Sequence, residues 1–280
     1  MTITRRYVAL GDLVVDCYYA DGKLLRVDGG GSKFNALCNL AVRGNLTCAI
    51  GACGNDLFGK IAIESLKNSK VDTKFIQVKG DMTKSYHLIL EKTRHTSIKN
   101  CPICGKKTWY DNSLQNTEYY LSHLNTDDVI ILDGLKDENI PILKQAKQQK
   151  VLDIGRIKRL INLTNQEILS LLQQANLDIL QLNETVEKYF LVRFGLINSK
   201  ELFKLLMPNL LVITRGKEGA DFITKDFHIS KKLLKYKQEI DDTGAGDAFF
   251  SVIIQNYFDH NKQVDKFWVE KTFEEANGLT

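Results

Sequence analysis

A short run of small residues followed by a carboxylate is the segment of this sequence best suited to chemistry. Gly244-Ala245-Gly246 leads into Asp247, and an apolar stretch that fits a buried helix continues to Phe258. A helix that begins at glycines leaves its first backbone N–H groups unpaired, and these donors, with the helix dipole, attract an anion. The pattern favours phosphoryl transfer to a hydroxyl with Asp247 as proton acceptor, although an aspartate is also simply a good first-turn residue.

A second motif lies much earlier in the chain. The glycine cluster 29–31 is followed by Asn35, and an Asp-x-Phe-Gly run occupies residues 56–59. Together and in this order, the two motifs resemble the two signatures of the ribokinase (PfkB-type) family of carbohydrate kinases. The resemblance extends from Tyr7 to the last residue.

This resemblance implies both a fold and a reaction. The fold is a ribokinase-like three-layer α/β/α domain with a mostly parallel central sheet and a small β lid. The reaction is ATP-dependent phosphoryl transfer, with Mg²⁺, to a hydroxyl of a small sugar or sugar derivative. Asp247 matches the family's catalytic base, and Gly244, Ala245 and Gly246 match the anion hole that holds the transferring phosphoryl group.

Length and composition agree with such a protein. The chain has 280 residues, a net charge of +4, 44% hydrophobic and 26% charged residues, which predicts one α/β domain over residues 1–280. We expect a cytoplasmic protein with reduced cysteines, without a membrane span or signal peptide, and the slight charge gives no indication of nucleic-acid binding. Residues 276–280 resemble the start or middle of the family's final helix, which leaves open that a longer polypeptide continues beyond them.

Short apolar runs alternate with helical patterns along most of the chain, which predicts βαβ units and a mostly parallel sheet. Strands are expected at residues 7–10, 47–51, 129–132, 151–152, 178–182 and 210–213, and helices at 140–149 and 165–175. Polar or glycine residues follow these strands. Because ligands of open α/β sheets bind at the carboxyl ends of the strands, we expect the site there.

Two segments depart from the alternation. Residues 12–28 and 81–115 have the pattern of short β hairpins and loops, and not of βα units. The resemblance identifies them as the lid over the sugar, a part that the family often uses to form a homodimer.

Residues that match the family's sugar-binding positions lie near the first glycine cluster. Asp16 matches the aspartate that accepts hydrogen bonds from sugar hydroxyls, with Gly30 and Gly31 beside it. Asn35 is expected to tie the glycine loop to the edge of the site. Lys33 stands where a small residue is usual, so it would suit a sugar acid or sugar phosphate if it faces the pocket, but it could equally point outward.

Two further substrate residues are expected at strand ends. Asp133 would contact a hydroxyl or support a residue that does. Arg156 resembles an arginine that meets the substrate's anionic group in sugar-acid and phosphosugar kinases, although its spacing from Asp153 is off by one residue.

The nucleotide positions come from two other segments. Thr214, Arg215, Gly216 and Gly219 match the family's turn that contacts nucleotide phosphates. Asn277 matches a position against the adenine.

The resemblance places Mg²⁺ near Asn183 and Glu184, which match a pair that organises the ion through water. Val186 falls where the family has a glutamate, and Glu187 comes one residue late. An Asn-Glu pair after a strand is also an ordinary helix start. Asp242 stands where the family has an uncharged residue, and we expect it to face solvent.

Cys101-Pro102-Ile103-Cys104-Gly105 forms one complete zinc knuckle inside the presumed lid. Tetrahedral zinc needs about four ligands, and only the isolated His95 and His123 are candidates nearby. The alternatives are a turn with reduced thiols, or a zinc site shared between two chains.

Two other functions remain open. A nucleoside kinase on the same fold would use aromatic or amide groups of the lid, where Tyr86, His87, Trp109 and Tyr110 are available. A non-catalytic sugar- or nucleotide-binding relative would not need the intact motif at residues 244–247.

Overall fold

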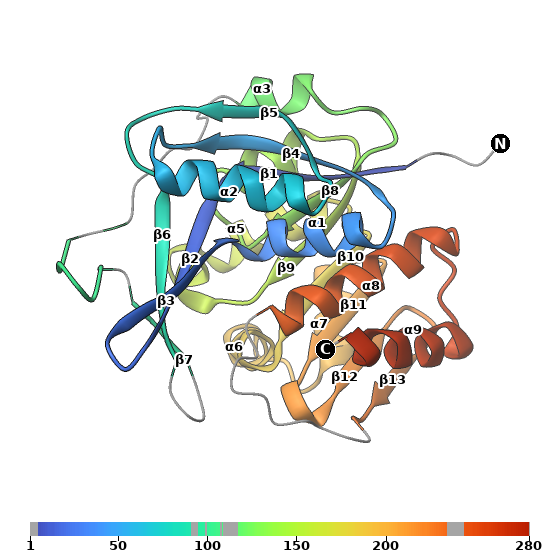
Figure 1. Cartoon of the computed structure of the whole chain (residues 1–280). Coiled ribbons are helices and arrows are strands. Elements are labelled where there is room, and N and C mark those ends of the chain that lie inside the picture. The colour runs from blue at the N-terminus through green and yellow to red at the C-terminus, as the bar shows by residue number, and fades with distance from the viewer. Residues whose placement is uncertain are drawn as a thin grey trace. The chain divides into compact units, whose positions relative to one another are not determined.

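The computed structural model describes residues 5–90, 95–98, 100–106, 108, 117–233 and 244–279 (Figure 1). The chain divides into two compact units. Unit 1 comprises Met1–Leu124 and Lys237–Asp247, and unit 2 comprises Asn125–Tyr236 and Ala248–Thr280. The single domain expected from the sequence stays a prediction.

Unit 1 contains three parallel strands in the order β1-β4-β5. The strands β1 and β4 are almost continuously buried, as expected for a parallel sheet that is covered on both faces. Their bounds, with those of the helices of this unit, are β1 (Arg6–Asp12), β4 (Leu46–Cys53), β5 (Asp72–Val78), α1 (Ser32–Val42), α2 (Leu57–Asn68) and α3 (Thr117–Ser122).

Unit 1 also contains a second, four-stranded sheet, in the order β3-β2-β6-β7. Its strands are β2 (Val14–Ala20), β3 (Lys23–Gly30), β6 (Lys84–Leu90) and β7 (His95–Ile98). The β2–β3 and β6–β7 pairs are antiparallel, whereas β2 and β6 run parallel. The described parts of both presumed lid segments therefore form one small sheet, which confirms the β structure expected there.

Unit 2 has four parallel strands, followed by two antiparallel ones that extend the same sheet. They are β8 (Val129–Asp133), β9 (Gln149–Ile154), β10 (Ile179–Asn183), β11 (Leu210–Thr214), β12 (Ala220–Ile223) and β13 (His228–Lys231). The helices of this part of the chain are α4 (Asn139–Gln145), η1 (Ile157–Asn162), α5 (Asn165–Gln174), α6 (Glu184–Phe194), α7 (Ser199–Leu206), η2 (Gly216–Glu218), α8 (Ala245–Asp259) and α9 (Lys266–Leu279). The helix α8 begins in unit 1 and continues into unit 2.

The helix expected at residues 140–149 is shorter than its sequence pattern indicates, because α4 ends at Gln145. The buried ammonium of Lys150 donates to the carbonyl oxygens of Ala146 at 2.7 Å and Gln148 at 3.0 Å. These backbone acceptors are satisfied without further helical turns, and the chain enters β9 at Gln149. Within the described residues, every helix is too short or too polar to cross a membrane.

Candidate active site

The carboxylate of Asp247 is held by two side chains from the first turns of α1. The Asn35 amide nitrogen Nδ2 donates to Asp247 Oδ2 at 2.8 Å, and the Ser32 hydroxyl donates to Oδ1. Residues three apart lie on one face of a helix, so both donors point the same way. Gly31, with φ of 94°, makes the turn that starts α1 and aims this face. Both carboxylate oxygens are therefore fixed in direction.

The sequence did not identify Ser32 as a site residue. Its signal was present, since a serine and an asparagine three residues apart follow the glycine cluster at a helix start. Nothing local to these two residues, however, indicates an acceptor more than two hundred positions further along the chain.

Among the described residues, nothing fills the space beside Asp247 at the start of α8. A Cβ atom built at Gly244 or Gly246 meets no described atom within 4 Å, and Gly244 has a positive φ of 89°. The helix that begins here is 15 residues long and carries Asp247 in its first turn. Its first N–H groups can bind an anion next to a fixed carboxylate, and the roles expected for Gly244, Ala245, Gly246 and Asp247 stay predictions.

Asp16 lies in β2 and is 8% exposed. Its carboxylate packs against the bare Cα of Gly30: a Cβ atom built there would lie 2.2 Å from Asp16 Oδ2. No other residue type fits at position 30 unless the carboxylate moves. The glycine cluster thus places the aspartate as well as starting α1.

Lys33 is 3% exposed, so its side chain is buried and does not point out to solvent. Its Nζ lies 5.6 Å from the centre of the Phe34 ring. A buried ammonium is placed to act on a nearby anion, but its role in a substrate pocket stays a prediction.

The Asp-x-Phe-Gly run has a positioning role that the sequence did not reveal. Asp56 caps α2 by accepting from the Gly59 N–H at 2.8 Å. The same carboxylate accepts from the hydroxyl of Thr83 at 2.6 Å and from its backbone N–H at 2.9 Å. The start of α2 is thereby fixed to the residue that precedes β6. Next to it, Lys84 in β6 pairs with the buried Asp12 at the end of β1, with 3.0 Å between Nζ and Oδ2.

In unit 2, the strand ends named from the sequence form two pairs in register, and the second pair lies two residues further along the strands than the first. Asp133 pairs in register with Asp153, and Asn183 pairs with Thr214. Because all four strands are parallel, these residues share the carboxyl edge of the sheet. Asp133 also forms an ion pair with Lys136, a residue that the sequence analysis did not single out.

Asn183 and Glu184 stand at the start of α6. Asn183 Oδ1 accepts from the Val186 N–H at 2.9 Å, and Nδ2 donates to the Gly155 carbonyl at 2.8 Å. Glu184 is half-buried at this edge, with its side chain 45% exposed, and pairs with Lys188. The hydrogen bond from the Lys188 ammonium is the main cause that lowers the pKa of the Glu184 carboxyl. A partly exposed carboxylate at a strand end fits the way proteins hold Mg²⁺, which keeps several waters and takes one or two carboxylates.

Arg215 and Glu187 are engaged with each other. Arg215 NH1 and NH2 donate to the two oxygens of Glu187 at 2.8 and 2.9 Å, and NH2 also donates to Asp221 at 2.6 Å. Ser199 donates to Glu187 as well, and Glu187 is 3% exposed. The hydrogen bonds that Arg215 makes to Glu187 raise the pKa of Arg215 further above its already high ordinary value. Burial opposes this rise, and the hydrogen bonds to Asp221 add to it. This cluster has the geometry of a buried structural ion pair.

The remaining predicted positions are placed as follows. The turn from Thr214 to Gly219 is closed by a hydrogen bond of 2.8 Å from the Arg215 N–H to the Gly219 carbonyl. A Cβ atom at Gly219 would lie 1.9 Å from the Lys231 carbonyl oxygen. The close packing against this carbonyl therefore requires a residue without a side chain at position 219. Arg156 is exposed before η1, and Asn277 is half-buried in α9. Asp242, Trp109 and Tyr110 lie outside the described residues.

The two knuckle cysteines bring together too few metal ligands. Among the described residues, no cluster of three or more histidine, cysteine, aspartate or glutamate side chains could hold a metal. His123 donates from Nδ1 to the Tyr119 carbonyl, 2.7 Å away, and its ring meets Phe75 edge to face. The side chain of His95 lies outside the described residues. A zinc site at Cys101 and Cys104 is therefore unsupported.

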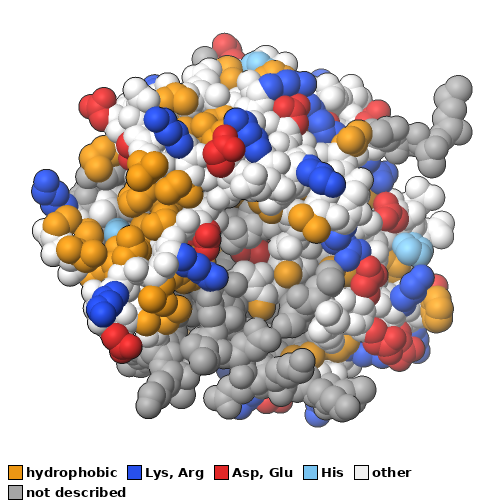
Figure 2. Space-filling model, viewed as in Figure 1, with side chains coloured by type: hydrophobic (Ala, Val, Ile, Leu, Met, Phe, Trp, Pro, Cys, Tyr) orange, Lys and Arg blue, Asp and Glu red, His pale blue; other side chains and the backbone are white. Residues whose placement is uncertain are grey.

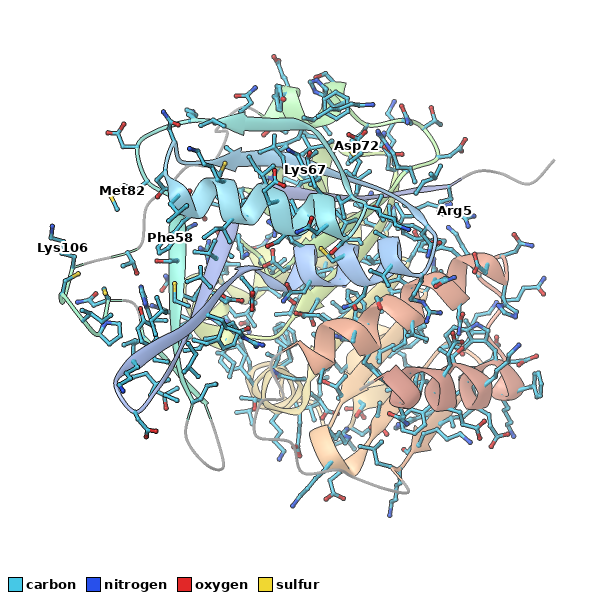
Figure 3. The ribbon with its side chains drawn as sticks, in the orientation of Figure 1. Arg5, Phe58, Lys67, Asp72, Met82 and Lys106 are labelled. Carbon is cyan, nitrogen blue, oxygen red and sulfur yellow. The ribbon has the colours of Figure 1, made fainter. Side chains whose placement is uncertain are left out.

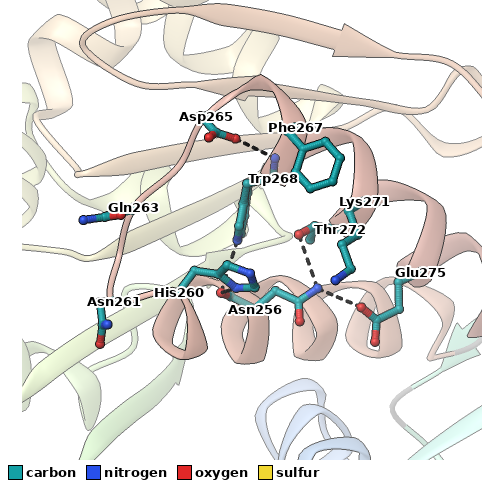
Figure 4. Close-up of a pocket in the computed structure, with 10 residues that line it drawn as sticks. All are labelled: Asn256, His260, Asn261, Gln263, Asp265, Phe267, Trp268, Lys271, Thr272 and Glu275. Carbon is teal, nitrogen blue, oxygen red and sulfur yellow. Dashed lines mark hydrogen bonds between the residues drawn. The ribbon is translucent and has the colours of Figure 1, made fainter.

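A cavity of about 400 Å³ lies between α8 and α9, but none of the predicted site residues lines it (Figure 4). Its polar groups bond one another: Asn256 Nδ2 donates to Glu275 at 2.9 Å and to Thr272 at 3.3 Å. Trp268 Nε1 donates to the Asn256 carbonyl at 3.1 Å. These bonds join the two helices, so we read the cavity as part of their packing.

Comparison with known proteins assigns the chain to a family. The model of the pfkB family carbohydrate kinases matches residues 5–275. The chain therefore belongs to the pfkB family of carbohydrate kinases, as the two motifs predicted.

Among curated relatives, Fructokinase-1 of Zea mays is 37% identical over 91 residues, which are 32% of this chain and 27% of the relative. The chain thus spans about a quarter of the length of that relative. Among solved structures, a fructokinase from Vibrio cholerae has a TM-score of 0.71 at 18% identity, with 98% of this chain and 90% of that chain covered. Aminoimidazole riboside kinase from Salmonella enterica also has a TM-score of 0.71, at 19% identity over 98% and 91% of the two chains. The ribokinase-like α/β fold is confirmed.

Proposed function

We propose that this protein transfers a phosphoryl group from ATP to a hydroxyl of a small sugar or sugar derivative. The observation that carries the proposal is the carboxylate of Asp247, fixed by Ser32 and Asn35 beside open space at the start of α8. A general base must be aimed at the proton it removes, and the two donors orient the carboxylate.

In this proposal Asp247 accepts the proton of the substrate hydroxyl while that oxygen attacks the γ-phosphoryl group. The first N–H groups of α8, at Gly244, Ala245 and Gly246, stabilise the charge on the transferring group. Phosphoryl transfer asks little covalent chemistry of the protein, so positioning supplies most of the acceleration.

The substrate side rests on Asp16, with Asn35, Gly30 and Gly31 shaping its surroundings and Asp133 as a further hydroxyl contact. The buried ammonium of Lys33 favours a substrate with a carboxylate or phosphate, and Arg156 is a second candidate for that group. Fructose in the Vibrio cholerae structure supports a sugar as the class of substrate.

The nucleotide side rests on Thr214, Gly216, Gly219 and Asn277, and the ADP and ATP analogue named in the two solved structures support ATP as the donor. We assign Arg215 to holding this turn through Glu187 and Asp221. For Mg²⁺ we favour Glu184, with Asn183 orienting the helix start, over the buried Glu187. When bound, Mg²⁺ would neutralise charge on the phosphates.

A nucleoside is the second candidate substrate, because aminoimidazole riboside kinase shares the fold. Of the lid residues suited to a base, His87 is 2% exposed and lies against Tyr19 and Ser85, which makes it unsuited to stacking on a ligand. Tyr86 is half-buried.

A homodimer through the small sheet is part of the proposal. Leu24 and Leu25 of β3 are 46% and 58% exposed. Figure 2 shows hydrophobic side chains gathered on the side of the molecule where Figure 1 draws β3.

An ATP-consumption screen over sugars, sugar acids, sugar phosphates and nucleosides tests the proposal. With an accepted substrate, Asp247→Asn should lose ~10²–10⁴-fold or more in kcat. Asp259→Asn, at the exposed other end of the same helix, is the matched control and should keep full activity. Near wild-type turnover by Asp247→Asn would overturn the assignment of the base, and absence of ATP turnover with every class of substrate would overturn the kinase proposal.

A further inference from the structure

The knuckle cysteines lie three residues apart in a closed turn of unit 1, Cys101 at its start and Cys104 inside it. The Cys101 N–H donates to the Lys106 carbonyl at 2.9 Å, and the Gly105 N–H donates to the Cys101 carbonyl at 2.8 Å. Gly105 has a φ of 70°, which allows the chain to turn back. Residues three apart in a turn lie within about 7 Å of each other between Cα atoms, close to the span that a disulfide needs. Figure 3 shows Lys106, next to this turn, at the outer side of the unit.

Four hydrogen-bond donors act on the ionisation of the Cys101 thiol. They are the backbone N–H groups of Cys104 and Ile103, the Cys104 thiol and the Tyr19 hydroxyl. Burial works against ionisation of this thiol, but the four donors outweigh it and lower the pKa of Cys101 below its ordinary value. A thiolate at this position is stabilised, and the thiolate is the nucleophilic form of cysteine.

The Tyr19 hydroxyl belongs to a longer hydrogen-bond chain. It lies 2.9 Å from Nδ1 of His87, whose Nε2 lies 3.3 Å from the Ser85 hydroxyl. A phenol has one proton, so a hydroxyl that donates to sulfur must accept from Nδ1–H. Burial lowers the pKa of His87, which keeps its ring neutral and lets Nε2 accept from Ser85. Each group in this hydrogen-bond chain, from Ser85 through His87 to Tyr19, then has a partner when Cys101 is a thiolate.

The other described cysteines have different surroundings. Cys17, Cys48 and Cys53 are buried in strands. Burial raises the pKa of Cys17 to about 12 and that of Cys53 to about 11, and it also raises that of Cys38. Cys104 is exposed and Cys101 is half-buried. Reactivity should therefore be confined to the knuckle pair.

We infer that Cys101 and Cys104 form a redox-active dithiol, with Cys101 as the attacking thiolate, Cys104 as the resolving thiol and Tyr19 as a positioning donor. The oxidant is a small disulfide such as oxidised glutathione. The Cys101 sulfur attacks one glutathione sulfur, the glutathione S–S bond breaks, and the released thiolate takes a proton. Cys104 then loses its proton to solvent, attacks the Cys101 sulfur and expels the second glutathione. Two cysteines lose two electrons and two protons, and one oxidised glutathione becomes two thiols.

The first test exposes the reduced full-length protein to excess oxidised glutathione. Two thiols per chain should disappear, and mass mapping should find Cys101 joined to Cys104, with release by dithiothreitol. Cys104→Ser should instead accumulate glutathione on Cys101, while the matched control Cys38→Ser should behave as the wild type. A pair that stays reduced would overturn the inference. Stoichiometric zinc in protein purified without chelator, with a disulfide forming only after its removal, would also overturn it by making the pair a metal site.

The second test addresses Tyr19. Tyr19→Phe keeps the ring that packs in β2 but removes the donor, so Cys101 should be alkylated about tenfold more slowly at pH 7. The pH at which alkylation reaches half its limiting rate should rise in this variant. An unchanged pH profile would remove Tyr19 from the assignment, and an unchanged profile in His87→Phe would limit the chain to the phenol alone.

Discussion

Asn35 Nδ2 lies 2.8 Å from Asp247 Oδ2, so a residue of the first signature motif orients the catalytic residue proposed in the second. Ser32, on the same face of α1, holds the other oxygen. The two motifs are separate in the sequence, but their side chains meet at a single carboxylate.

Asn35→Ala should lower kcat by about 10- to 100-fold, because it removes one hydrogen bond to a charged group and frees the carboxylate to rotate. The substrate KM should change less, since Asn35 acts on the base. Asn39→Ala is the matched control, because Asn39 lies one turn further along α1 and donates to the Asn35 carbonyl at 3.0 Å. Steady-state kinetics decide the question, and equal losses in both variants would indicate damage to α1 instead.

Gly30→Ala should displace Asp16, because the new methyl group would overlap its carboxylate. We expect a loss of ~1–3 kcal/mol in the free energy of unfolding and a raised KM for the sugar. Gly278→Ala adds the same methyl group where nothing described lies within 4 Å, and it should leave KM unchanged. Urea unfolding and kinetics measure both effects. A fully active, fully stable Gly30→Ala variant would contradict the packing of Asp16.

Lys33→Ala should raise KM for an anionic substrate far more than KM for a neutral sugar, since it removes an ammonium from the proposed pocket. Lys33→Met keeps most of the buried stem and separates loss of charge from loss of packing. If both variants affect the two classes of substrate equally, the side chain serves the core and gives no indication of an anionic substrate.

Arg215→Ala should destabilise unit 2 by ~3–5 kcal/mol, because Glu187 and Asp221 would be left buried without their shared cation. Lys188→Ala breaks the exposed pair with Glu184 and should leave the unfolding midpoint nearly unchanged. Chemical unfolding followed by circular dichroism compares the two variants. Small, equal shifts would mean that Arg215 is free to serve the nucleotide.

Much of the fold could be predicted from the sequence, because strand runs such as 129–132 and 210–213 are apolar throughout and end in polar residues. The edge shared by Asp133, Asp153, Asn183 and Thr214 follows from that pattern once the strands are parallel. The end of α4 could not be predicted, since the sequence pattern does not show that Ala146 takes extended backbone and that its carbonyl accepts from the Lys150 ammonium.

The candidate site was harder to predict from the sequence, because its contacts join distant parts of the chain. Asp247 and Asn35 were found through motif resemblance, and no spacing rule connects residues so far apart. Arg215 was expected at phosphates because of its type and position. Its bonds to Glu187 and Asp221 depend on how α6, β11 and β12 pack.

The link between Ser32, Asn35 and Asp247 has a consequence for the order of events during synthesis. The two donors leave the ribosome early, together with the glycine cluster and Asp16, whereas their acceptor is made 212 to 215 residues later. An N-terminal portion that has already folded can place Asp16, the residue proposed to bind the sugar, but it lacks the proposed base. In the proposed mechanism, a nascent chain cannot transfer a phosphoryl group until α8 has been translated.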